Sequence, residues 1–277
     1  METGQKPIQK SNKSSNNNKL SIQVSLNGFS FCILDDTKKE ITHFQENIFD
    51  KKQTPSQVLD QLKESLNTSS QLQAEFDELV VIHENELATL VPLPLFDQDH
   101  LADYLKFNSR ILQTDFITFD TIESINSANV YVPYVNINNY LYDQFGEFKY
   151  QHSSTILITS LIAHSKVNNG MSFYVHVGIN HFEIIIIENN QLLLYNSFDY
   201  RTKEDFIYYI LFTAEQLQLD PESQKVVLLG NIDKDGALFG MVFKYIRHVE
   251  ILDNISPYLL ENEKDITASN FIQYNSF

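Results

Sequence analysis

Potential metal ligands surround one tight turn in the second half of the chain. His176 precedes the turn at residues 178–180, and His181 and Glu183 follow it. Two opposed strands could bring these imidazoles together around a metal ion. The same spacing also fits a structural role, with His181 exposed and His176 packed or hydrogen-bonded, and we favour that interpretation. We therefore predict no metal site.

Other reactive side chains have simpler explanations. The candidates are a partial calcium loop at Asp233 and Asp235, a serine nucleophile at Ser153 or Ser154, and the thiol of Cys32. The calcium pattern lacks its remaining ligands, and no Gly-x-Ser-x-Gly elbow surrounds the serines, so a turn and a helix cap explain them. Cys32 lies in an apolar run, where a thiol behaves as a small hydrophobic group. The sequence also has neither a GxxxxGK[ST] loop nor a GxGxxG fingerprint, so we predict no catalytic residue and no cofactor.

The turn belongs to a structural unit that the chain contains twice. In the later copy, alternating and apolar runs predict strands at residues 173–177, 181–187 and 191–196, a helix at 202–217 and a closing strand at 226–229. The earlier copy has the same order, with strands at 21–26, 29–34 and 40–48, a helix after residue 54 and a strand at 80–83. Each copy is therefore a three-stranded meander, a helix and a parallel strand.

The helix starts fix the relation between the two copies. Thr54 with Gln57 forms a capping-box pattern, and Thr202 stands at the same point of the later copy. Thr54 and Thr202 are 148 residues apart, and Ser25 and His176 are 151 apart. We therefore align Ser25 with His176. The later helix is unusually aromatic, and we expect core packing, with a partner-binding face as the alternative.

The remaining segments predict additional elements and a division of the chain. We expect a disordered tail at residues 1–18 and two lobes at 19–148 and 149–277. The apolar run at 152–164 predicts a helix that bridges the lobes, and the residues after 252 are expected at the surface. Further helices are expected at 97–107, 136–145 and 237–247, and further strands at 116–119, 128–132 and 249–252.

Composition restricts the function. The 277 residues are 43% hydrophobic, with 20 Phe and 14 Tyr, which is enough for well-packed cores. A formal charge of -16 argues against nucleic acid or an anionic membrane as partner. No run approaches the length of a membrane span, and a single cysteine allows no intramolecular disulfide. We expect an acidic cytoplasmic protein without membrane insertion.

The order of elements is typical of one fold class. It predicts an α/β chain of two lobes, each with a mixed sheet flanked by helices. That order resembles the ribonuclease-H-like unit, and its duplication resembles the actin-like ATPase superfamily. The segment LSIQVSLNGFSFCIL at residues 20–34 is similar to the opening of an uncharacterised bacterial family of that superfamily. The second unit is also similar to the actin-like scaffold proteins of type IV pilus assembly.

This resemblance implies a cleft between the lobes, and it indicates which residues of the cleft differ from those of active members. Active members of the superfamily open each half with a strand, an Asp and a Gly-rich turn that holds phosphate. With Ser25 and His176 at the Asp positions, neither carboxylate is kept, and hydrolysis is not expected. The residues expected to line the degenerate nucleotide cleft are Ser25, Asn27, Gly28, His176, Gly178, Asn180, Gly230 and Asn231.

We therefore predict a non-catalytic interaction scaffold, a pseudo-ATPase that binds a protein partner. The alternative is an active ATP-dependent enzyme, a small-molecule kinase or ATPase, with metal-binding carboxylates relocated to positions such as Asp120 or Glu183. Nucleotide binding is possible, but it is not expected to be hydrolytic. A ribonuclease-H-type nuclease would need an acidic ligand on the first strand, where the aligned residue is Ser25, and the net charge opposes it.

Overall fold

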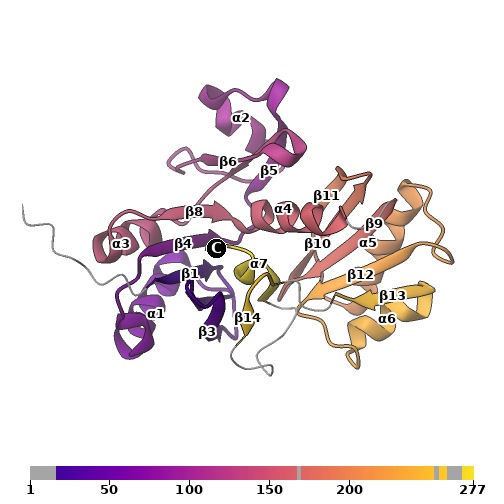
Figure 1. Cartoon of the computed structure of the whole chain (residues 1–277). Coiled ribbons are helices and arrows are strands. Elements are labelled where there is room, and N and C mark those ends of the chain that lie inside the picture. Colours follow the sequence, from indigo (N-terminus) through magenta and orange to yellow (C-terminus); the bar gives the residue numbers. More distant parts are fainter. Residues whose placement is uncertain (1–16, 167–169, 253–255, 261–269) are drawn as a thin grey trace, which may run out of the picture.

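The computed structural model describes residues 17–166, 170–252, 256–260 and 270–277. Two sheets form the two lobes, and a third, smaller sheet stands apart from both (Figure 1). The predicted tail at residues 1–18 lies mostly outside the described residues, but Asn18 is already the first residue of a strand.

The first sheet has the strand order β14-β3-β2-β1-β4-β8. Its strands are β1 (Asn18–Val24), β2 (Gly28–Asp35), β3 (Glu40–Ile48), β4 (Glu78–His83), β8 (Lys149–His152) and β14 (Leu259–Leu260). The first three strands are an antiparallel meander, and β4 is parallel to β1, as predicted.

The second sheet has the order β11-β10-β9-β12-β13, which repeats the path of the first. Its strands are β9 (Met171–Val177), β10 (His181–Glu188), β11 (Gln191–Asp199), β12 (Lys225–Gly230) and β13 (His248–Ile251). The repetition extends to an irregularity. Between the second and third strands, Thr42 of one lobe and Leu193 of the other are skipped by the pairing register, so both meanders carry a bulge at the same place.

Two long helices follow the meanders at the predicted places. Helix α1 (Pro55–Thr68) begins at Thr54 and α5 (Lys203–Gln216) at Thr202, and both threonines complete a capping box with the residue at the third helical position. The other helices are α2 (Leu101–Leu105), α3 (Val135–Phe145), α4 (Ser153–Ser165), α6 (Ala237–Tyr245) and α7 (Phe271–Tyr274). The helix predicted at 97–107 is shorter than expected, because its first turn is a 3-10 turn at Gln98–His100.

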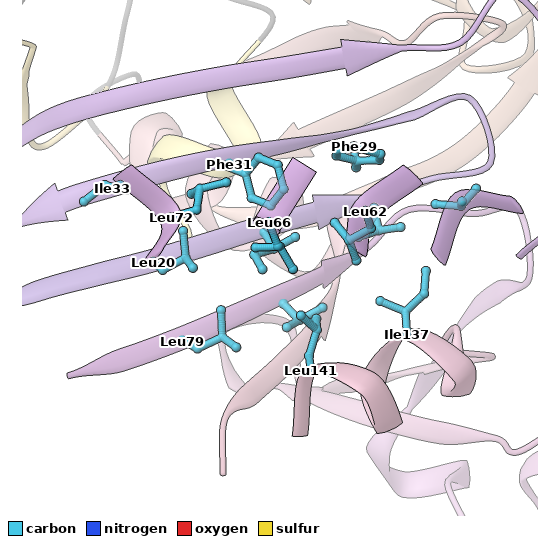
Figure 2. Close-up of a cluster of buried hydrophobic side chains, with 14 residues drawn as sticks. Leu20, Phe29, Phe31, Ile33, Leu62, Leu66, Leu72, Leu79, Ile137 and Leu141 are labelled. Atoms are coloured by element: carbon cyan, nitrogen blue, oxygen red, sulfur yellow. The ribbon is translucent and has the colours of Figure 1, made fainter. Parts of the chain in front are cut away.

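Helices α1 and α3 cover the outer face of the first sheet. Figure 2 shows this core, where Leu62 and Leu66 of α1 and Ile137 and Leu141 of α3 meet the apolar side chains of the strands. The strand residues that point into this core are Leu20, Phe29, Phe31, Ile33 and Leu79. Because side chains alternate along a strand, their neighbours point to the opposite face, where Cys32 and Leu34 pack against Tyr274 of α7 and Val80 and Ile82 pack toward the second lobe.

Helix α4 packs between the two lobes, as predicted for residues 152–164. Its apolar side chains form one core with Val80 and Ile82 of β4 and with Tyr174 and Ile185 of the second sheet. On the far side of that sheet, α5 and α6 cover a third core. Helix α4 therefore joins the inner faces of both sheets.

The third sheet is a small antiparallel unit inserted into the first lobe. It has the order β5-β7-β6, with β5 (Ala88–Pro92), β6 (Thr118–Ile122) and β7 (Ser127–Tyr131). In Figure 1 it stands above the first lobe with α2 beside it. The strands predicted at 116–119 and 128–132 correspond to β6 and β7.

The end of the chain corrects one prediction. Residues after 252 were expected at the surface, but all four residues of α7 are buried. Gln273 donates to the carbonyl oxygens of Ser21 and Ser30, so the helix is attached to β1 and β2. The division at residues 148 and 149 stays a prediction, although β8 pairs with β4, and both β8 and α7 contact the first lobe.

Candidate functional site: the cleft between the lobes

A cleft of about 610 Å³ opens between the two lobes. Asn27, Glu84 and Tyr134 line it from the first lobe, and Asn180 and Tyr200 line it from the second. The amide of Asn180 donates to the side-chain oxygen of Asn27 across the cleft, at 3.4 Å. The two hairpin turns of the duplicated unit therefore face each other, as the resemblance implies.

The hairpin register corrects the alignment of the two lobes. In the first lobe the amide of Ser25 donates to the carbonyl of Gly28, and in the second the amide of Gly178 donates to that of His181. These bonds close equivalent turns, so Ser25 corresponds to Gly178. Two residues earlier on each strand, Gln23 corresponds to His176. Counting residues therefore gave the wrong partner for His176, and if His176 is aligned with the second acidic position of the resemblance, Gln23 takes the first.

Gln23 and His176 each hydrogen-bond to a glutamate. The amide nitrogen of Gln23 donates to Oε2 of Glu84 at 2.7 Å, and Nδ1 of His176 lies 2.8 Å from Oε2 of Glu183. His181 stands between the two glutamates, with Nε2 3.6 Å from Glu84 and 3.7 Å from Glu183. A continuous polar chain, which we call the interlobe chain, therefore runs from β1 of one lobe to β9 of the other.

Burial and charge determine the protonation of the interlobe chain. Burial alone would raise the pKa of Glu183, but His176 and His181 beside it hold that pKa well below its usual value. Burial alone would lower the pKa of His181, but the carboxylates of Glu183, Glu84 and Asp199 raise it to about 9. At neutral pH His181 is therefore a cation between two carboxylates.

The structure confirms the predicted burial of one histidine of the interlobe chain and corrects the predicted exposure of the other. His176 is buried and hydrogen-bonded, as expected, whereas His181 is only 19% exposed, so its predicted exposure is wrong. Its ring packs over Gly178, where an added Cβ would lie 2.6 Å from the imidazole. Among the described residues, no cluster of His, Cys, Asp and Glu has the arrangement of a metal site.

At two of the glycines predicted for the cleft, close contacts within the protein leave no room for a side chain. A Cβ on Gly28 would lie 2.4 Å from the carbonyl oxygen of Asn47, and one on Gly230 would lie 2.4 Å from that of Val177. Gly230 also has φ +90°, which disfavours other residues. The amide of Asn231 donates to the same Val177 carbonyl at 2.7 Å. The turn after β12 therefore packs tightly against β9.

Seven of the eight predicted cleft residues line one of two cavities, and Gly230 lines neither. Ser25, Asn27 and Asn180 line the large cleft. Gly28, His176, Gly178 and Asn231, together with Ser25, line an adjoining cavity of about 110 Å³. The hydroxyl of Ser25 donates to the Gly28 carbonyl and accepts from the amide of Asn27, so it completes its own turn.

Sequence reasoning missed Gln23 and Glu84. Gln23 lies on the face of β1 opposite to Leu20, Ile22 and Val24, and strand alternation could have shown that it faces away from the core, where it lines the adjoining cavity. Glu84 directly follows β4, at the carboxyl end of a parallel strand, which is a common place for ligand-binding side chains.

The groups of a Mg²⁺-dependent phosphate site are not present at these turns. Gln23 and His176 stand at the positions that we align with the two carboxylates of active members, and the amides of Asn27 and Gly178 are already hydrogen-bonded within the protein. Glu183 is paired with the imidazole of His176 and with the cationic imidazole of His181. The residues of the cleft therefore do not fit the metal and phosphate chemistry of active actin-like ATPases.

Known proteins share both this sequence pattern and this fold. The model of a protein family of unknown function, DUF3822, matches residues 8–249. The chain therefore belongs to the DUF3822 family. Among curated proteins, none matches the sequence.

The solved structures support the fold that the strand order predicted. A Bacteroides thetaiotaomicron VPI-5482 protein with actin-like ATPase fold and unknown function is 25% identical, with a TM-score of 0.75 over 86% of this chain and 91% of that one. The PilM-PilN type IV pilus biogenesis complex matches at 9% identity, with a TM-score of 0.61 over 93% of this chain and 97% of that one. The chain has a duplicated ribonuclease-H-like, actin-like ATPase fold. Within the described residues, no helix is long and apolar enough to span a membrane.

Proposed function

We propose that this protein is a cytoplasmic interaction scaffold, a pseudo-ATPase whose two lobes are held together by protein contacts instead of by a nucleotide and metal. The observation that carries the proposal is the interlobe chain. Gln23 and His176, which we align with the two acidic positions of the resemblance, each hydrogen-bond to a glutamate. His181 then connects Glu84 and Glu183, so contacts within the protein link the two lobes at the wall of the cleft.

The relocated carboxylates of the enzymatic alternative are engaged elsewhere. Asp120 accepts hydrogen bonds from the Tyr131 hydroxyl, the His152 amide and the Thr155 hydroxyl, and burial raises its pKa. A carboxylate with three donors and a raised pKa is a poor ligand for a hard cation. Glu183, the other candidate, is paired with two histidines.

Two further observations support a binding role. The PilM-PilN complex contains the same fold together with a second protein, which supports a protein partner. The net charge of -16 supports a partner other than nucleic acid. Localisation in the cytoplasm is supported by the single, fully buried cysteine, which forms no disulfide within the chain.

Nucleotide binding and turnover provide the test. Thermal unfolding is measured with ATP, ADP and GTP, each with and without Mg²⁺, because a ligand of the native state raises the melting temperature. Phosphate release is measured in parallel. We expect no turnover and no Mg²⁺-dependent shift. Mg²⁺-dependent phosphate release that is abolished by Glu84→Gln or Glu183→Gln would overturn the proposal and support the enzyme. A Mg²⁺-independent shift without turnover would agree with a cleft that binds nucleotide but does not hydrolyse it.

A further inference from the structure

The internal duplication provides a reference for the surface of helix α5. Helices α1 and α5 start at equivalent capping threonines, Thr54 and Thr202. Equivalent positions on their inner faces are buried in both lobes, as shown by Val58 and Phe206, by Leu62 and Ile210, and by Leu66 and Ala214. The two helices therefore pack in the same orientation, and their outer faces can be compared residue by residue.

The outer faces have the same exposure but different chemistry. In α1 the exposed positions are occupied by Ser56, Asp60, Glu64 and Asn67. The equivalent positions of α5 are also exposed and are occupied by Glu204, Tyr208, Phe212 and Glu215, which we call the α5 stripe. Where the first lobe has two carboxylates in solvent, the second has two aromatic rings. The first lobe shows that the fold itself does not require apolar residues there.

Tyr208 and Phe212 form a single apolar patch. The side chains are 59% and 44% exposed, and their rings stack with centroids 6.0 Å apart and planes inclined by 18°. Aromatic residues are enriched at protein interfaces, where a few anchor residues supply most of the binding energy. Tyr208 and Phe212 are exposed, and the equivalent positions of α1 carry carboxylates. The pair is therefore a candidate contact surface.

The charges around the patch indicate what would cover it. Glu204 lies one turn before Tyr208 and Glu215 lies one turn after Phe212, so a carboxylate flanks each end of the aromatic pair. The stripe contains no cation and spans about 16 Å, which is roughly three helical turns. We propose that the α5 stripe binds an amphipathic helix of a partner protein that carries apolar residues between flanking Lys or Arg side chains. This proposal names the surface that the scaffold of the preceding section would use, and so rests on that function.

The test uses a synthetic amphipathic helical peptide of leucine and lysine, labelled for fluorescence anisotropy, and the full-length protein without nucleotide. The double variant Tyr208→Asp/Phe212→Glu gives α5 the residues of α1. We expect it to bind the peptide at least about tenfold more weakly, because the central aromatic contacts are lost. The variant is more acidic than the natural chain, so a peptide held by charge alone would bind it at least as tightly. An unchanged or higher affinity would therefore overturn the proposal.

Matched variants distinguish binding at the α5 stripe from nonspecific binding elsewhere on the surface. Tyr142→Asp changes an equally exposed tyrosine on α3, 57% exposed, and should leave the affinity unchanged. Glu204→Gln/Glu215→Gln should weaken binding and reduce its dependence on salt. A loss with Tyr142→Asp as large as with the stripe variant would overturn the proposal. A dimer in analytical ultracentrifugation that dissociates in the stripe variant would also overturn it and assign the face to a second copy. No nucleotide is present in the peptide-binding experiment. If the peptide does not bind as expected, the scaffold function is therefore still tested separately by the phosphate-release measurement.

Discussion

The two lobes follow the same path, yet they stabilise their hairpin turns by different chemistry. In the first lobe, the hydroxyl of Ser25 closes the turn, and the amide of Gln23 donates to Glu84 after β4. In the second, the imidazole of His176 forms a buried pair with Glu183, and the ring of His181 packs over the turn. At equivalent positions, the duplicated topology thus accommodates the amide of Gln23 in one lobe and the imidazole of His176 in the other. It also means that each lobe provides a control for the other.

Removing the buried carboxylate should have the largest effect. Glu183→Ala leaves His176 without its acceptor and His181 with Glu84 alone, and loss of one partner of a buried pair typically costs roughly 3–5 kcal/mol. The equivalent residue of the first lobe is Ser30, which donates to Gln273 at 2.7 Å. Ser30→Ala should cost only about 1 kcal/mol, as for a neutral hydrogen bond. Urea unfolding at pH 7 measures both. Equal losses would show that the charged turn contributes no more than the neutral one.

A glycine after β12 gives the next largest effect. Gly230→Ala places a Cβ against the carbonyl oxygen of Val177 at a positive φ, and steric overlap with strain should cost about 2–4 kcal/mol. Gly146→Ala is the control, because it has φ +79° but no atom within 4 Å of the added Cβ. Strain alone there should cost about 1–2 kcal/mol. If the two losses measured by thermal unfolding are the same, the close approach of the turn to β9 contributes nothing.

Local signals in the sequence were sufficient to predict most helices and strands, but they were insufficient to align the two repeated units with each other. The capping boxes at Thr54 and Thr202, the apolar run of α4 and the alternation of the meanders identified most of the fold. Counting residues failed at the turns, because the separation of equivalent residues is 153 in the hairpins and 148 in the helices. Helix α7 was missed because four residues are too few for a helical period, and its burial depends on contacts of Gln273 with distant strands.

The cleft was predicted only in part for a related reason. The turn residues Asn27 and Asn180 could be found from their own segments, and they do meet. Glu84 could not, because its role depends on Gln23 of one strand and His181 of the other lobe. No local pattern in the sequence contains these three residues together. Sites built across a duplication therefore need the register of both copies before their side chains can be assigned.

The pH dependence of the interlobe chain gives the smallest and most specific effect. The folded pKa of His181, about 9, is above its usual value of 6.5. Protonation therefore favours the folded state, and the contribution is complete below pH 6.5 and is lost as the pH rises through 9. His181→Gln should cost roughly 1–3 kcal/mol at pH 6 and progressively less at pH 8 and pH 10. Urea unfolding of both proteins at each pH measures the difference, and His248→Gln, an exposed imidazole on β13, controls for the substitution. A difference that stays constant across this range would mean that His181 is not a cation between Glu84 and Glu183. The charged link between the lobes would then be replaced by neutral hydrogen bonds like those of the first turn.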